Sequence, residues 1–127
     1  MVALQLRLMR AARAFLDPML HLGQISPEHA RQVLLDEVVL SPAMARQEVD
    51  RYTFRSPAQA ASYFYGYQQL LALRTRAEIA LGEHFDRAAF NNFLLDQGLL
   101  PPDLLADAVM NQFVRDARNT PPATARP

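Results

Sequence analysis

The chain has 127 residues, and half of them are hydrophobic, which fits a folded domain that can bury a core. Its 13 basic and 13 acidic residues cancel to a formal net charge of zero, which argues against a nucleic-acid-binding module with its usual basic excess. The sequence contains no cysteine, which excludes disulfides and thiolate metal sites.

The N-terminal segment carries three arginines at helical spacing, Arg7, Arg10 and Arg13. They interrupt its apolar residues, and no apolar run in the chain approaches the roughly 20 residues of a membrane span. A signal-peptide core and its small-residue cleavage site are also missing. We therefore expect the cytoplasm as the default location, unless a longer parent protein carries a signal, and neither membrane nor nucleic acid as a partner. We interpret the three arginines as a solvated helix face, with contact to an acidic partner as the alternative.

Helix starts are marked by three serine–proline pairs: Ser26-Pro27, Ser41-Pro42 and Ser56-Pro57. A serine side chain accepts a hydrogen bond from an orphan N–H group, and proline at the first helical position loses no needed donor. Ser56 and Gln59 also match a capping box, in which the two side chains satisfy each other's backbone. Asp86 and the pair Pro101-Pro102 mark two later starts.

Helix ends are marked by three glycines that follow apolar runs: Gly23, Gly82 and Gly98. The starts and ends together predict an all-α fold, with about six helices in an irregular bundle. The expected spans are 3–22, 27–39, 42–54, 57–81, 87–97 and 102–116, and the fourth is one long central helix. We expect residues 1–116 to form a single helical domain and residues 117–127, which have no apolar period, to form a disordered tail.

The three histidines, His21, His29 and His84, offer no metal motif. A helical zinc motif needs two histidines four residues apart, and none has such a partner, so we expect no metal or other cofactor in this chain. His21 follows Asp17 by four residues, which places both side chains on one helix face. Two interpretations of His21 stay open: a histidine oriented by a carboxylate, or a cation at the negative end of a helix dipole.

Gly66 is unusual because it lies inside the longest predicted helix, where glycine costs about 1 kcal/mol relative to alanine. At about 100° per residue, one stripe of that helix carries Gln59, Tyr63, Gly66, Leu70 and Arg74. Either a substrate or peptide backbone approaches this stripe closely, with Tyr63 and Arg74 as donors, or another helix packs against Gly66.

Several motifs, in order along the chain, resemble one bacterial family. They are Asp17 with His21, Glu48-Val-Asp-Arg-Tyr52, Pro57-Ala-Gln-Ala-Ala-Ser-Tyr63 with Gly66, Leu73-Arg74, Ala77-Glu78, Leu81-Gly82, Phe85-Asp86 and Phe90 through Pro101. The family is the bacterial "domain of unknown function 885", whose members look like zinc metallopeptidases of the gluzincin type. The resemblance extends over roughly residues 5–114.

The resemblance implies a place for this chain in a larger protein. Family members resemble long helical peptidases whose His-Glu-x-x-His zinc helix lies upstream of the region matched here. The chain is then the C-terminal, substrate-side segment, which is inactive alone, and zinc is expected only in a longer parent protein. Tyr63 is implied as a donor to a developing oxyanion. Gln59, Gly66, Arg74 and His21 are implied as substrate-side residues.

The chain departs from the family pattern at three positions. Ala58 stands where glycine is usual, Asn91 where histidine often follows phenylalanine, and Tyr67 at a usually less aromatic place. We expect Ala58 to restrict the backbone at the start of the long helix, and Asn91 removes any role of the histidine.

The implied partners are a peptide substrate in the full-length protein and the chain's own N-terminal peptidase portion. An alternative function is a helical protein–protein interaction module that acts as a homodimer and exposes a large apolar patch. A third alternative, a helix-turn-helix DNA binder over residues 27–54, is disfavoured by the zero net charge and by four acidic residues in that region: Asp36, Glu37, Glu48 and Asp50.

Overall fold

The computed structural model describes residues 2–119, and the described residues form helices and connecting turns without a strand. This confirms the predicted all-α fold. The chain divides after Tyr67 into two compact units, which we call the N-terminal unit and the C-terminal unit. The long helix α4 (Gln59–Leu81) contributes residues to both. Each unit has a hydrophobic core of its own. This division does not test the single domain expected over residues 1–116, which stays a prediction.

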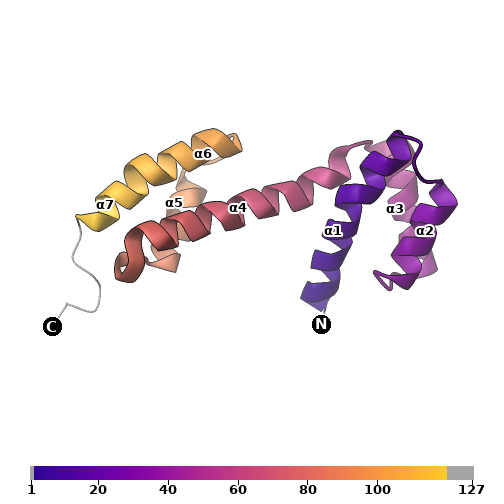
Figure 1. Ribbon diagram of the computed structural model, residues 1–127, viewed down its shortest axis with the longest axis horizontal. Coiled ribbons are helices and arrows are strands. Elements are labelled where there is room, and N and C mark those ends of the chain that lie inside the picture. Colours follow the sequence, from indigo (N-terminus) through magenta and orange to yellow (C-terminus); the bar gives the residue numbers. More distant parts are fainter. Residues whose placement is uncertain (1, 120–127) are drawn as a thin grey trace. The chain divides into compact units, whose positions relative to one another are not determined.

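The N-terminal unit contains α1 (Val2–His21), α2 (Pro27–Asp36), α3 (Pro42–Asp50) and the start of α4 (Figure 1). A π-helical turn, Arg51–Arg55, continues α3 and is closed by the N–H of Ser56, which donates to the carbonyl of Arg51 at 2.9 Å. α2 packs between α1 and α3, and α1 also contacts the π-helical turn. This arrangement brings α1, the π-helical turn and the start of α4 together.

The core of the N-terminal unit follows the helical period of the sequence. On α1, Met9, Ala12 and Leu16 recur at spacings of three and four residues, so their side chains lie on one face. The buried residues of this core are Met9, Ala12, Leu16, Ala30, Leu34, Val38, Leu40, Ala45, Val49, Tyr52 and Ala60.

Two of the predicted serine caps are present in this unit. The Oγ of Ser26 accepts from the N–H of His29 at 3.1 Å, and the Oγ of Ser41 accepts from the N–H of Met44 at 3.3 Å. In both helices proline follows at the first position. The predicted starts of α2 and α3 are therefore confirmed, with the physical cause that the sequence suggested.

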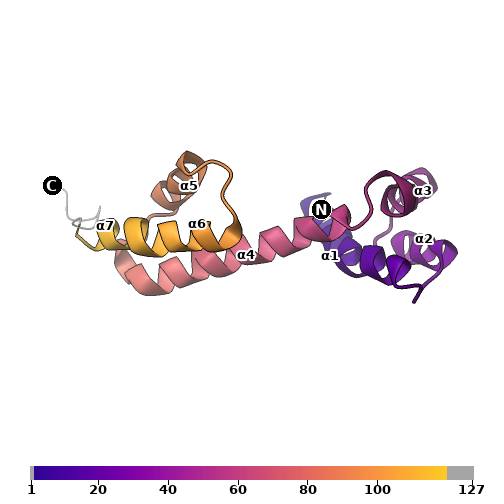
Figure 2. The ribbon, with the colours of Figure 1, turned by 90° about the horizontal axis from the view of Figure 1, so that it is seen from above.

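The C-terminal unit contains the second part of α4, then α5 (Arg87–Asp96), α6 (Pro102–Ala108) and α7 (Val114–Arg118). A second π-helical turn, Val109–Phe113, joins α6 and α7 without a break, and both helices run alongside α4 (Figure 2). The ring of Phe113 lies 5.7 Å from that of Phe90 and 5.5 Å from that of Phe93. The buried residues of this second core are Leu73, Ala77, Leu81, Phe90, Val109, Phe113 and Val114.

The ends of the helices agree with most of the predictions. Gly23, Gly82 and Gly98 all have φ values between +53° and +67°, the left-handed region that glycine adopts without a steric penalty. α7 extends to Arg118, whose Nη2 donates to the carbonyl of Ala80 at 3.1 Å, so the first residues of the predicted tail are helical. Residues 120–127 of that tail lie outside the described residues. Within residues 2–119, no helix is both long and apolar enough to cross a membrane.

Candidate functional site

Helix α1 directs two charged side chains into the N-terminal unit. Arg13 is 7% exposed and Asp17 is completely buried. Both follow Met9 at four-residue spacing, which places them on the same face as the apolar core residues. The predicted solvated face is therefore wrong for Arg13, because this guanidinium has a partner inside the unit.

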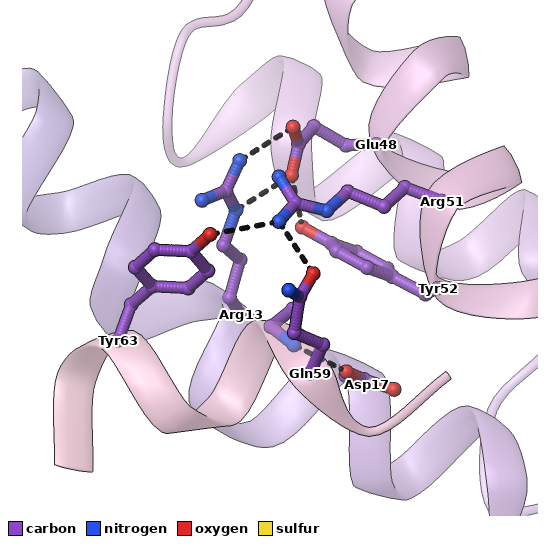
Figure 3. Close-up of polar contacts among 8 residues, drawn as sticks. Arg13, Asp17, Glu48, Arg51, Tyr52, Gln59 and Tyr63 are labelled. Atoms are coloured by element: carbon purple, nitrogen blue, oxygen red, sulfur yellow. Dashed lines mark hydrogen bonds and ion pairs between the residues drawn. The ribbon is translucent and has the colours of Figure 1, made fainter. Parts of the chain in front are cut away.

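That partner is Glu48, at the end of α3. Arg13 donates from Nε and Nη2 to the two carboxylate oxygens of Glu48 at 2.6 and 2.5 Å, and the hydroxyl of Tyr52 donates to the same carboxylate at 2.9 Å (Figure 3). Burial lowers the pKa of Arg13, but the hydrogen bond and the charge of Glu48 outweigh burial, so the pKa is raised. Burial, with the charge and hydrogen bond of Glu48, raises the pKa of the fully buried Tyr52. The carboxylate is thus held from two sides.

The π-helical turn positions a second arginine, Arg51, toward α4. Its Nη2 donates to Oε1 of Gln59 at 2.8 Å and to the hydroxyl of Tyr63 at 3.1 Å (Figure 3). The guanidinium carbons of Arg51 and Arg13 lie 5.4 and 5.6 Å from the centre of the Tyr63 ring, within the range of a cation–π attraction. We call Arg51, Gln59 and Tyr63 the Arg51 cluster.

Asp17 connects α1 to the start of α4. Its Oδ1 accepts from the N–H of Ala58 and its Oδ2 from the N–H of Ala60, both at 3.0 Å. The carboxylate therefore satisfies N-terminal donors of α4 from another helix. The predicted capping box of Ser56 and Gln59 is wrong: α4 begins at Gln59, and the amide of Gln59 is bound by Arg51 instead.

His21 lies beside Asp17, as their spacing predicts. Its Nε2 is 3.3 Å from Oδ1 of Asp17 and 2.9 Å from the carbonyl oxygen of Tyr52. Both neighbours are hydrogen-bond acceptors, so Nε2 carries the hydrogen and Nδ1 is the nitrogen left for other partners. The side chain is 40% exposed, and the contacts favour the interpretation of a histidine oriented by a carboxylate.

Ala58 has a left-handed backbone, with φ of +63°, which favours glycine over any residue with a Cβ. We expect Ala58→Gly to raise the free energy of unfolding by about 0.5–1 kcal/mol, because relief of the steric penalty exceeds the entropy that glycine loses on folding. Urea denaturation measures this change. The control is Ala61→Gly, inside α4, which should instead lower the free energy of unfolding by about 1 kcal/mol. Destabilisation by both substitutions would contradict the backbone assignment at Ala58.

The other two predicted residues, Gly66 and Arg74, form no side-chain hydrogen bond with the Arg51 cluster in the described part of the chain. A Cβ added to Gly66 would meet no atom within 4 Å among the described residues outside its own helix backbone and chain neighbours, so no helix packs against it there. Arg74 belongs to the C-terminal unit and binds Glu78, four residues away on α4, with 2.7 Å between Nε and Oε1. The structure thus brings Tyr63 and Gln59 together around Arg51, and places His21 on the Asp17 side of the same unit.

Three residues of the site carry no chemistry predicted from the sequence: Arg13, Glu48 and Arg51. Glu48 and Arg51 both belong to the Glu48-Val-Asp-Arg-Tyr52 motif of the family resemblance. For Arg13, the available signal was its place on the same stripe as Met9 and Leu16, where a charge needs a buried partner.

The donor set for a metal ion is not present in the part of the chain that the structure describes. No three side chains of histidine, cysteine, aspartate or glutamate are grouped there in a way that could hold one. The residues described here therefore do not fit a zinc centre by themselves, and no chemical step is assigned to a metal in this chain.

Comparison with known proteins gives one match. Residues 1–109 match the family described as "Bacterial protein of unknown function (DUF885)". No curated protein and no solved structure gives a significant match. The matched residues include the whole N-terminal unit, and with it the Arg51 cluster and the Asp17–His21 pair.

Proposed function

We propose a function from the premise that this chain belongs to the bacterial DUF885 family. In this proposal, the chain is the C-terminal, substrate-side helical segment of a zinc-metallopeptidase-like protein, and the chain does not catalyse hydrolysis alone. The resemblance of its motifs to this family, whose members look like gluzincin-type zinc peptidases, supports the reaction class. The observation that carries the proposal is the state of the Tyr63 hydroxyl, which accepts from Arg51 and has no acceptor of its own among the described residues.

Tyr63 has the properties of an oxyanion donor. Its oxygen accepts from the Arg51 guanidinium at 3.1 Å, so its own hydrogen stays available for another acceptor, and the side chain is 42% exposed. The adjacent positive charge favours a ligand oxygen on which negative charge develops. A fixed donor of this kind stabilises a transition state because it needs no reorganisation when the charge forms.

The surrounding residues hold the phenol in place. Gln59 and Arg51 contact each other across the gap between α4 and the π-helical turn, and Arg13 lies over the Tyr63 ring while bound to Glu48. His21, fixed by Asp17 and by the carbonyl of Tyr52, supports the start of the same helix from α1. In this proposal, Gln59 positions Arg51 and His21 supports the start of α4 through Asp17, whereas Tyr63 contacts the substrate. Gly66, with open space beside it, provides bare backbone on the same stripe of α4.

Tyr63→Phe tests the assignment in a zinc-loaded form of the protein that is extended upstream in its own gene. We expect kcat/KM for peptide hydrolysis to fall about 100-fold to 1,000-fold, because one donor to the transition state is lost. Metal content should not change.

The matched control is Tyr65→Phe. Tyr65 lies on the same helix, is more exposed than Tyr63, and makes no side-chain hydrogen bond among the described residues. This variant should keep the wild-type rate. A Tyr63→Phe protein that hydrolyses peptides as fast as the wild type would exclude Tyr63 as the donor.

A second candidate function is a helical interaction module that associates with another copy of itself. The observation that favours it is the number of large apolar side chains that the described residues leave exposed, among them Phe54, Ile79, Leu95 and Leu99. The two candidates differ in whether an upstream extension adds metal and activity, so zinc content and peptide hydrolysis of the chain and of its extended form separate them.

A further inference from the structure

We infer that the Arg51 cluster binds a carboxylate, and that the bound group is the free C-terminal carboxylate of a peptide. That this peptide is a substrate rests on the proposed function, but the binding step does not require a metal or hydrolysis. The observation that leads to this inference is a guanidinium without an acidic partner. Arg51 is held by an amide oxygen and a phenol oxygen, both neutral.

Arg13 and Arg51 differ in their hydrogen-bond partners. Both guanidiniums lie over the ring of Tyr63, but Arg13 donates from Nε and Nη2 to the carboxylate of Glu48. Arg51 makes both of its contacts through Nη2, and Nε and Nη1 have no acceptor within residues 2–119. Asp50, its neighbour in sequence, forms no ion pair with it. An arginine with free donors on a planar fork is suited to bind a carboxylate through two hydrogen bonds.

Tyr63 supplies a further donor from a different helix. Its oxygen lies 3.1 Å from Nη2 of Arg51, which is close enough for one anion to contact both groups. Since the phenol accepts from Arg51, its hydrogen can only be given to a third group. An anion at this place would therefore be held by the π-helical turn through Arg51 and by α4 through Tyr63 (Figure 3).

The local charge favours a monoanion such as a carboxylate over a phosphate. Arg13 and Glu48 neutralise each other, and the carboxylate of Asp17 is buried and bonded to two backbone N–H groups. Arg51, in contrast to Arg13, has two neutral partners and no carboxylate partner among the described residues. Glu48, bound on the other side by Arg13 and Tyr52, would repel a second negative charge on the ligand.

The test compares two forms of one short peptide, with a C-terminal carboxylate and with a C-terminal amide, for binding to the full chain by nuclear magnetic resonance titration. We expect the free acid to bind about tenfold more tightly, as one charge-assisted contact provides. Arg51→Gln should abolish this preference. The matched control Arg55→Gln should keep it, because Arg55 ends the same π-helical turn, is exposed, and has no side-chain partner in the described part of the chain.

A second variant guards against a folding defect in Arg51→Gln. Tyr63→Phe keeps the ring over the guanidiniums, removes one donor, and should reduce the preference for the acid without abolishing it.

Equal binding of acid and amide by the wild type, no binding of either, or an undiminished preference in Arg51→Gln would overturn the inference. Displacement of the acid peptide by inorganic phosphate at a lower concentration than acetate would overturn the choice of carboxylate. If the chain prefers the acid but the extended protein does not hydrolyse peptides, the carboxylate-binding site is supported and only the proposed function is refuted.

Discussion

Replacement of Arg13 by methionine should lower the free energy of unfolding of the N-terminal unit by about 3–5 kcal/mol. The methionine fills much of the space of the arginine stem, but it leaves the Glu48 carboxylate, 13% exposed, with Tyr52 as its remaining side-chain partner. The cost arises mainly from an unpaired charge in a buried place, and the loss of packing adds little. Urea denaturation followed by circular dichroism measures the effect.

The control for this substitution is Arg10→Met on the same helix. Arg10 is half-exposed and forms no ion pair among the described residues, so its replacement should change the free energy of unfolding by less than about 0.5 kcal/mol. Equal effects of the two substitutions would show that the ion pair with Glu48 is not what stabilises the unit.

Tyr52, which is hydrogen-bonded to Glu48, should make the free energy of unfolding decrease at alkaline pH. Burial and Glu48 raise the pKa of Tyr52 above its ordinary value of about 10, so the folded chain holds this proton more tightly than the unfolded chain. The stabilisation is therefore complete below pH 10 and declines as the pH rises above it. Repeating the urea experiment between pH 8 and pH 11 should show a steeper decline for the wild type than for Tyr52→Phe.

Asp17→Ala is the second substitution with a large expected effect. It removes both acceptors of the N–H groups of Ala58 and Ala60, and it leaves the second of these donors buried without a partner. Two hydrogen bonds to a charged group are lost, each worth about 1.5–3 kcal/mol, so we expect the free energy of unfolding to fall by about 3–6 kcal/mol. Amide hydrogen exchange should become faster at the start of α4.

Asp86→Ala is the matched control because Asp86 also caps a helix. Its Oδ1 accepts one bond, from the N–H of Ala89 at 2.8 Å, and the residue is exposed. Loss of an exposed local cap costs about 1 kcal/mol. Similar effects of the two substitutions would mean that α4 does not depend on the carboxylate that α1 supplies.

Local rules predicted most of the fold. Ser26, Ser41 and Asp86 cap the helices that follow them, and each does so through a bond to a residue three positions later. Such contacts lie within one turn of chain, so the sequence alone contains the information they need. The start of α4 is the exception, since its cap comes from Asp17, 41 residues away from Ala58.

The candidate site could be predicted only in part for the same reason. Tyr63 and Gln59 can be identified from the sequence because they share a helical stripe, and His21 because it follows Asp17 by one turn. The partners that define their chemistry, Arg51 from the π-helical turn and Arg13 from α1, depend on how three segments pack together. A π-helical turn has no simple sequence pattern, so the direction of Arg51 could not be foreseen.

The most direct test of the proposed function is the zinc content and peptide hydrolysis of this chain beside a form extended upstream in its own gene. The account predicts that only the extended form binds about one zinc ion per chain and cleaves peptides. Hydrolysis by this chain alone that survives a chelator would contradict it. An extension that adds neither metal nor activity would also refute the peptidase account, and self-association of the chain would then explain the exposed apolar residues better.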